Sequence, residues 1–185
     1  MSTLRELTAE SHTRAENTVF MRLLMAKALT PYEYMDYLTQ FTLVYDGLEY
    51  AANRFGILQE FPGIQRSDKI KEDLEEANIV NCKRSPLRLS TTTYYNYLID
   101  LNDEQKIAAH FYVRFAGDMF GGQMLKGLVP VTLGRMYDFD SNLPVLRMKM
   151  REFAKPNLAE EANKAFGYTI DIVDEICGVK RDLWL

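Results

Sequence analysis

Apolar residues return at helical spacing along almost the whole 185-residue chain, and alternating, strand-like runs are scarce. The clearest case begins at Thr30-Pro31-Tyr32-Glu33, which combines a capping residue, a proline in the first turn and a capping-box glutamate. After it, apolar residues recur every three or four positions toward a stop near Gly56: Tyr34, Tyr37, Leu38, Phe41, Tyr45, Leu48 and Ala52. This periodicity predicts an all-α fold.

The same pattern predicts the other helices and the domain organisation. We expect Ser67 to cap a short charged helix, and we expect further helices over residues 4–27, 90–101, 103–130, 143–153 and 158–179. No internal repeat, low-complexity segment or domain linker interrupts them. The chain is therefore expected to form one helical domain over residues 1–185.

Composition narrows the class of protein. Apolar residues make up 47% and charged residues 26%, the balance of a soluble globular protein. The net charge is 22 − 26 = −4, and no basic stripe interleaved with aromatics suggests a nucleic-acid partner. Cys82 and Cys177 are far apart in sequence, so we expect no disulfide framework and a reducing, cytoplasmic setting. No run approaches the roughly 20 apolar residues of a membrane span, and the N-terminus has no apolar signal core.

Three glycines interrupt a stretch that otherwise reads as helix, RFAGDMFGGQML over residues 114–125. Each glycine inside a helix costs roughly 1 kcal/mol relative to alanine, so Gly117, Gly121 and Gly122 need a reason. One explanation is a close crossing by another helix; the other is a flat ligand pressed against bare backbone. In the second case Asp118 would lie at the edge of the ligand, where it could anchor a water.

The two histidines differ in how well their neighbours in sequence suit a metal ligand. His12 and Glu16 are four residues apart and therefore on one helix face, and a metal-binding histidine often has its second ring nitrogen held by a carboxylate. The alternative is a half-exposed histidine in a weak ion pair. His110 is interpreted as a packed or surface residue. A di-iron carboxylate bundle is excluded, because it needs two Glu-x-x-His motifs and neither histidine has a glutamate three residues earlier.

Two motifs resemble those of a known family, the heme oxygenases. LRELTAESHTRAENTVFM, Leu4 to Met21, resembles their proximal-helix motif, and YVRFAGDMFGGQML, Tyr112 to Leu125, resembles their distal signature GDLSGGQ. LTQFTLVYDGLEY and EEANKAFGYTIDI resemble the helix after the proximal one and the C-terminal helix. The segments follow the family's order and cover most of the chain. Without the C-terminal membrane anchor of the animal enzymes, the chain is expected to resemble the soluble bacterial, cyanobacterial and viral forms.

The resemblance implies an all-α fold that holds heme between a proximal and a distal helix. It implies an enzyme that uses dioxygen to cleave heme to biliverdin, carbon monoxide and ferrous iron, with heme as both substrate and cofactor. Electrons would come from a ferredoxin or a flavoprotein reductase, since GDMFGGQ is no nucleotide-binding GxGxxG motif. The product would pass to a bilin reductase in photosynthetic lineages, whereas pathogens use the reaction to release iron; both uses stay open.

The resemblance also implies roles for particular residues. His12 would be the axial iron ligand, with Glu16 as its partner. Gly117 and Gly121 would line the distal face, Gly122 would let the helix kink, and Asp118 would hold a water that supplies protons. The remaining expected site residues are Tyr45, Tyr112 and Arg114 in the distal hydrogen-bond network, Arg5, Arg147 and Arg151 at the heme propionates, and Met21 and Phe166 at the heme pocket. For the arginines the alternative is a solvated surface position, and for Phe166 it is the core.

Three positions depart from the family pattern. Phe120 replaces a serine, Thr169 replaces an asparagine of the water network, and Ala9 replaces a propionate-side lysine; we expect them to affect rate and regiochemistry. Two other functions remain as alternatives. One is a heme- or bilin-binding helical protein without turnover. The other is a thiamin-degrading enzyme of similar fold, which would need a cysteine nucleophile.

Overall fold

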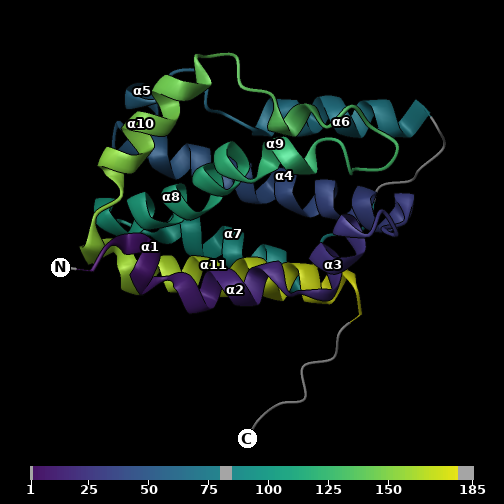
Figure 1. Ribbon diagram of the computed structural model, residues 1–185, viewed down its shortest axis with the longest axis horizontal. Helices are drawn as coiled ribbons and strands as arrows, with labels where there is room; N and C mark the ends of the chain where they lie inside the picture. Colours follow the sequence, from purple (N-terminus) through teal and green to yellow (C-terminus); the bar gives the residue numbers. More distant parts are fainter. Residues whose placement is uncertain (1, 80–84, 179–185) are drawn as a thin grey trace, which may run out of the picture.

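The computed structural model describes residues 2–79 and 85–178, and its regular elements are all helical (Figure 1). Cys82 lies outside the described residues. The helices are α1 (Leu4–Leu7), α2 (Ala9–Glu16), α3 (Val19–Met25), α4 (Pro31–Arg54), α5 (Ile57–Glu60), α6 (Ser67–Ile79), α7 (Leu89–Asp100), α8 (Glu104–Phe120), α9 (Gly122–Leu125), α10 (Leu143–Phe153) and α11 (Ala159–Ile176), with 3₁₀ turns η1 (Arg135–Tyr137) and η2 (Pro156–Leu158). The predicted all-α class is confirmed.

The N-terminal segment is not the single helix predicted over residues 4–27. It forms α1, α2 and α3, because side chains at the junctions bind backbone groups that a continuous helix would use. Asn17 Nδ2 donates to the Thr13 carbonyl at 2.8 Å. The Thr18 hydroxyl accepts from the Met21 amide at 3.3 Å and so caps α3. The break turns α3 away from the helix that carries His12.

Helix α4 begins where the capping box predicted. The Thr30 side chain accepts from the Glu33 amide, and the Glu33 carboxylate accepts from the Thr30 amide at 2.8 Å. The predicted capping role of Ser67 is wrong: Ser67 is the first residue of α6, and its hydroxyl donates to Asp46. The Ser67 hydroxyl therefore makes a contact between helices, from α6 to Asp46 on α4, and does not cap α6.

The predicted helix over residues 103–130 is shorter in the structure. Asp103 caps α8 by accepting from the Lys106 amide at 3.1 Å, and α8 ends at Phe120. Gly121 forms the junction to α9, and its amide donates to the Gly117 carbonyl at 2.9 Å. The glycine patch is therefore the place where the long helix stops.

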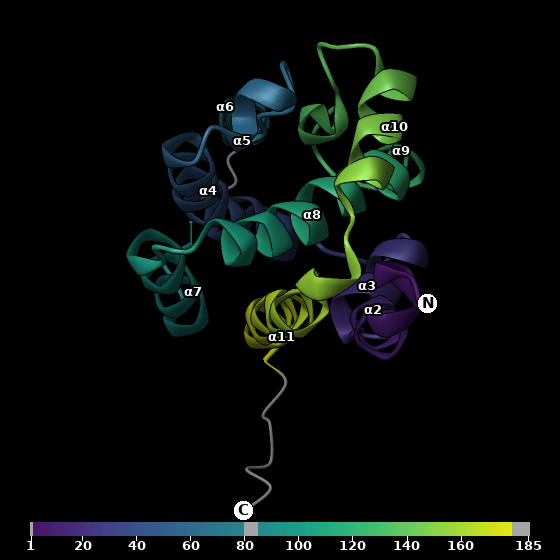
Figure 2. The ribbon, with the colours of Figure 1, turned by 90° about the vertical axis from the view of Figure 1, so that its left-hand side faces the viewer.

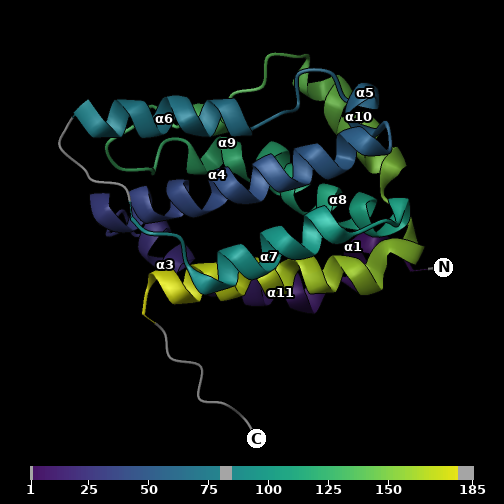
Figure 3. The same cartoon turned by 180° about the vertical axis from the view of Figure 1, so that it is seen from behind.

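Helix α8 runs through the middle of the molecule, between α4 and α11 (Figure 2). Helix α2 packs along α11, and α7 packs against α4 and α11 on the opposite side (Figures 1 and 3). Helices α2 and α9 lie on the same side of the molecule, on the right in Figure 2, with α11 and α8 toward the centre. Within the described ranges, no helix is long and apolar enough to span a lipid bilayer.

Candidate active site

The first group of expected site residues lies on α2 and α11. His12 Nδ1 is 3.3 Å from Glu16 Oε2, and the two side chains are 58% and 62% exposed. The Phe166 ring of α11 meets the His12 ring edge-on, with the centroids 5.8 Å apart. An exposed contact of this kind contributes little to stability. It does orient the imidazole, and in the neutral ring whose Nδ1–H donates to Glu16, Nε2 is the nitrogen that can bind a metal.

The second group is buried and joins α4 to the C-terminal half of α8. The Tyr45 hydroxyl donates to Asp118 Oδ2, and Arg114 Nη2 donates to the Tyr45 oxygen at 3.2 Å. Asp118 is only 5% exposed. The Arg114 guanidinium also lies 4.5 Å from the Phe41 ring centroid, which holds it from a second side. These contacts bring together Tyr45 and Arg114, which the resemblance assigned to the distal hydrogen-bond network, and Asp118, to which it assigned a water.

Electrostatics fix the protonation pattern of this second group. Burial raises the pKa of Tyr45 well above its ordinary value, so the phenol stays protonated and donates. Burial also raises the pKa of Asp118, while the Arg114 charge and the Tyr45 hydrogen bond oppose that rise. Tyr45 occupies Oδ2 of Asp118. Among the described residues Oδ1 accepts no hydrogen bond, so it is the atom able to hold a water or a proton.

Glycine is needed for different reasons at the positions of the patch. A Cβ added to Gly117 would meet no atom within 4 Å, and one at Gly121 would meet the Gly117 carbonyl at 3.1 Å. Packing within the chain therefore does not require glycine at 117, whereas a ligand lying on that backbone would. A Cβ at Gly122 would lie 2.3 Å from Tyr137 Cδ1, so Gly122 is required by the close approach of Tyr137.

The expected propionate arginines of α10 gather at the end of α8. Arg147 Nε donates to the Met119 carbonyl at 2.9 Å, so Arg147 satisfies one of the terminal carbonyls of that helix. The Phe120 ring lies 5.6 Å from the Arg147 guanidinium carbon and 5.4 Å from that of Arg151. Phe120, a departure from the family pattern, thus packs against the two arginines.

The other expected residues lie in separate places. Arg5 is exposed on α1, and its charge partly offsets the effect of burial, which raises the pKa of half-buried Tyr112 on α8. Met21 is half-buried and packs against the core. The Thr169 hydroxyl donates to the carbonyl four residues earlier at 3.0 Å, so it is engaged within α11.

His110 is a packed core residue, which is one of the two positions, packed or surface, that the sequence left open. It is fully buried on α8, and its Nδ1 and Nε2 contact the Tyr94 hydroxyl at 2.8 Å and Glu161 Oε1 at 3.1 Å. Because an ionised carboxylate only accepts, Nε2 carries the proton and Nδ1 accepts from Tyr94. Both ring nitrogens are used, which leaves none for a metal. The Glu161 and Tyr94 contacts were not predicted, since they come from α11 and α7.

Sequence reasoning also missed four buried residues that interact electrostatically with the Asp118 carboxylate: Tyr34, Tyr37, Arg66 and Tyr137. The spacing of Tyr37 and Tyr45, two helical turns apart on α4, could have revealed Tyr37. Arg66 and Tyr137 lie in connecting segments, where no periodic signal marks them.

The geometry fits heme as the bound group. His12 offers one imidazole nitrogen, a Cβ added to Gly117 would meet no atom within 4 Å, and the Arg114 Nε–H is a buried donor without a partner among the described residues. Among the described residues, no cluster of three or more His, Cys, Asp and Glu side chains could hold a metal ion. A single histidine is the ligand by which many heme proteins hold the iron.

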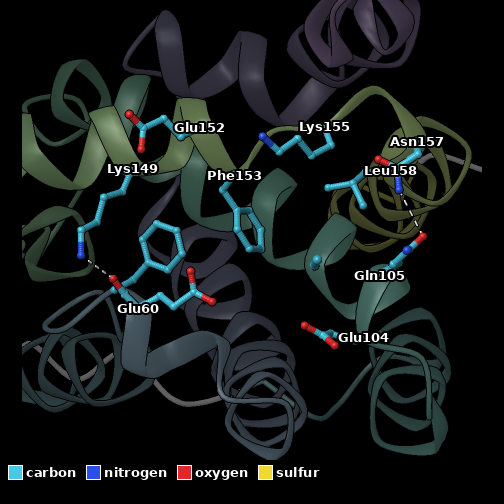
Figure 4. Close-up of a pocket in the computed structure, with 11 residues that line it drawn as sticks. Glu60, Glu104, Gln105, Lys149, Glu152, Phe153, Lys155, Asn157 and Leu158 are labelled. Carbon is cyan, nitrogen blue, oxygen red and sulfur yellow. Dashed lines mark hydrogen bonds between the residues drawn. The ribbon is translucent and has the colours of Figure 1, made fainter.

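A cavity of about 620 Å³ lies apart from these groups, among α5, α8 and α10 (Figure 4). Phe61 and Phe153 line it, and Lys149 Nζ at its rim donates to the Glu60 carbonyl at 3.0 Å. None of the expected site residues lines this cavity.

The thiol of Cys177 bears on the alternative of a cysteine nucleophile. Burial raises the pKa of Cys177 to about 11, which keeps that thiol protonated at neutral pH and unsuited to nucleophilic catalysis.

The exposed His12 on α2, together with Gly117 and Asp118 on α8, is an arrangement suited to binding heme in an all-α protein. The chain matches the family described as Heme oxygenase over residues 1–175, and it belongs to that family. It is 26% identical to Heme oxygenase 2 of Synechocystis, over 94% of this chain and 81% of that protein. The crystal structure of heme oxygenase-2 from Synechocystis, in complex with heme and NO, has a TM-score of 0.79 and 26% identity, covering 94% of this chain and 83% of that one. The heme oxygenase from Leptospira interrogans has a TM-score of 0.80 and 25% identity, covering 93% and 97%.

Membership of this family fixes the reaction. The protein is a heme oxygenase, which uses dioxygen to cleave heme to biliverdin, carbon monoxide and ferrous iron. Heme is both its substrate and its cofactor, and the electrons come from an external reductant.

Proposed function

We propose that this one-domain chain binds heme between α2 and the end of α8, with His12 as the axial ligand and Asp118 as the group that organises proton supply. The observation that carries the proposal is the buried Tyr45–Asp118–Arg114 group beside the open Gly117 backbone. Bound heme supplies the iron that activates dioxygen and the ring that is opened. A protein that only stores heme has no use for a buried carboxylate with one oxygen left free.

The residues divide the work in the proposed site. Glu16 orients the His12 imidazole, so that Nε2 binds the iron. Tyr45 holds one oxygen of Asp118, and the other oxygen can position a water and pass its proton toward the distal side. Gly117 and Gly121 leave room beside this water, because no side chain stands above their backbone.

The remaining expected residues surround this centre in the proposal. Tyr112 belongs to the distal side, and Gly122 lets Tyr137 pack beneath the helix end. Arg147 and Arg151 can bind heme propionates, since a guanidinium can grip a carboxylate with two donors. Arg5 is proposed for the same edge, and Phe166 and Met21 for the pocket near α2. We further propose a cytoplasmic protein that takes electrons from a ferredoxin or flavoprotein reductase and passes biliverdin to a bilin reductase.

The axial ligand can be tested by replacing His12. The variant His12→Ala is expected to lose the normal ferric-heme absorption spectrum and to regain it with added imidazole. Arg14→Ala, an exposed change on the same helix, is the control and should keep the spectrum. A normal spectrum in His12→Ala without imidazole would rule out His12 as the ligand.

The role of Asp118 can be separated from heme binding. The variant Asp118→Ala is expected to bind heme nearly as well as the parent, yet to give peroxidase-like products in place of most of the biliverdin. Asp36→Asn alters another buried carboxylate of the chain, which pairs with Arg88, and should retain the biliverdin yield. Product chromatography measures both. A normal yield from Asp118→Ala would show that another group organises the proton supply.

A further inference from the structure

Arg66 is a buried cation whose guanidinium donates to main-chain carbonyls, while its main-chain amide donates to Glu49 Oε1 at 2.5 Å. Arg66 lies between α5 and α6 and is 0% exposed. Its guanidinium donates to the carbonyls of Ile64 at 2.7 Å, Met136 at 3.0 Å, Gly63 at 3.2 Å and Asp138, and it lies 3.9 Å from the Phe139 ring centroid. None of these guanidinium hydrogen bonds goes to a carboxylate. The side chain therefore clamps two connecting segments while its charge stays uncompensated by direct contact.

Two of these carbonyls flank Tyr137, which is buried against the glycine patch. Arg66 binds the carbonyls on either side of Tyr137, at Met136 and Asp138. The Tyr137 ring occupies the space that a Gly122 side chain would need, and Gln123 Nε2 donates to the Tyr137 carbonyl at 2.7 Å. Tyr137 is thus held from the α6 side by Arg66 and from the α9 side by Gln123. The turn at the end of α8 therefore packs on the ring of a residue whose main chain is held from both sides.

The same residues connect to Asp118 electrostatically. The Tyr37 hydroxyl interacts with both Arg114 and Tyr137, and Arg114 in turn binds Tyr45, which donates to Asp118. The groups that act on the Asp118 carboxylate are Tyr45 of α4, Arg114 of α8 and Arg66, and the carboxylate in turn acts on Tyr34 and Tyr37 of α4 and Tyr137 of η1. Arg66 is the one cation here that comes from outside α4 and α8.

We propose that Arg66 and Tyr137 are positioning residues for Asp118: Arg66 holds Tyr137 against Gly122, fixes the end of α8, and contributes a buried positive charge that acts on the carboxylate. The inference rests on the proposed function, in which Asp118 organises proton supply. Neither residue has to touch heme for this role. Their effect passes through the glycine turn and through the charge.

The test measures Asp118 directly in the heme-free protein. Carbon-13 NMR of protein labelled at the aspartate carboxyl carbon follows the titration, and Asp118→Asn identifies the signal. In Arg66→Gln the pKa of Asp118 is expected to rise by at least about half a unit, because a nearby positive charge is lost. Arg66→Lys should keep most of the parent value. The control Arg54→Gln removes another guanidinium that binds main-chain carbonyls, at Ile99 and Leu101, and should leave the Asp118 titration unchanged.

An unchanged Asp118 titration in Arg66→Gln would overturn the charge part of the proposal. If Arg66→Gln fails to fold, Arg66→Lys decides the clamp part, because an ammonium cannot reproduce the planar fork of donors. Its nitrogen-15 spectra should show the Gly121 and Gly122 amide signals displaced more than that of Gly47 on α4; equal displacement would refute the clamp. Heme turnover by the parent protein is measured separately. Failure of turnover would refute the proposed function, whereas the titration and the amide signals would still decide the role of Arg66.

Discussion

Replacing Gly117 by alanine separates the stability of the helix from access to its surface. The residue lies within α8, and an added Cβ would meet no atom within 4 Å. Alanine is favoured over glycine inside a helix by roughly 0.5–1 kcal/mol. We therefore expect Gly117→Ala to stabilise the heme-free protein by that amount, which corresponds to a rise in Tm of about 2–4 °C for 1 kcal/mol in a domain of this size.

Heme binding should change in the opposite direction. If heme lies against the backbone of residue 117, the new methyl group stands where the ring would lie, and we expect at least about a tenfold loss of affinity, equivalent to 1.4 kcal/mol. Urea unfolding of the heme-free protein measures the first effect, and heme titration followed by absorbance measures the second. Gly167→Ala in α11, which is equally unobstructed, is the control for the helix-propensity gain. A Gly117→Ala protein that is less stable than the parent, or that binds heme equally well, would refute the reasoning.

Two further predictions concern packing and acid stability. Gly122→Ala should destabilise the fold by about 1–3 kcal/mol through overpacking, and Tyr137→Leu should relieve much of that loss in the double variant; equal unfolding free energies for the single and double variants would contradict this. Glu161 has its pKa lowered to about 2, first by the hydrogen bond from His110, so its stabilising effect is present above pH 4.5 and is lost as the pH falls toward 2. Glu161→Gln should therefore flatten the dependence of the unfolding free energy on pH between 5 and 3, and a dependence as steep as in the parent would contradict this.

The fold could be predicted where the signal is local. The capping box at Thr30 and Glu33 marked the start of α4, and the periodic apolar residues marked its length. The breaks at Thr18 and Gly121 were missed, because threonine and glycine are tolerated inside helices as well as at their ends. Such residues end a helix only when their side chains or neighbours make contacts that are more favourable than continuing the helix. Those contacts depend on tertiary structure.

The candidate site likewise contains residues that local spacing could predict and residues that it could not. His12 and Glu16 are four residues apart on one helix, and their spacing alone placed them on a common face. The bond from Tyr45 to Asp118 joins residues 73 positions apart, and it was not predicted; the family resemblance only placed Tyr45 in a distal hydrogen-bond network. Arg66 had no local mark, because a buried arginine and an exposed one look the same in sequence.

The reaction itself offers the most direct test. Purified protein reconstituted with heme and given a reductant system and oxygen should lose its Soret band while a broad red bilin band grows, and chromatography of the product should identify biliverdin. The same reductant system must first be shown to support a known heme oxygenase. A Soret band that then persists without decay would contradict the assignment of turnover and favour a protein that only binds heme.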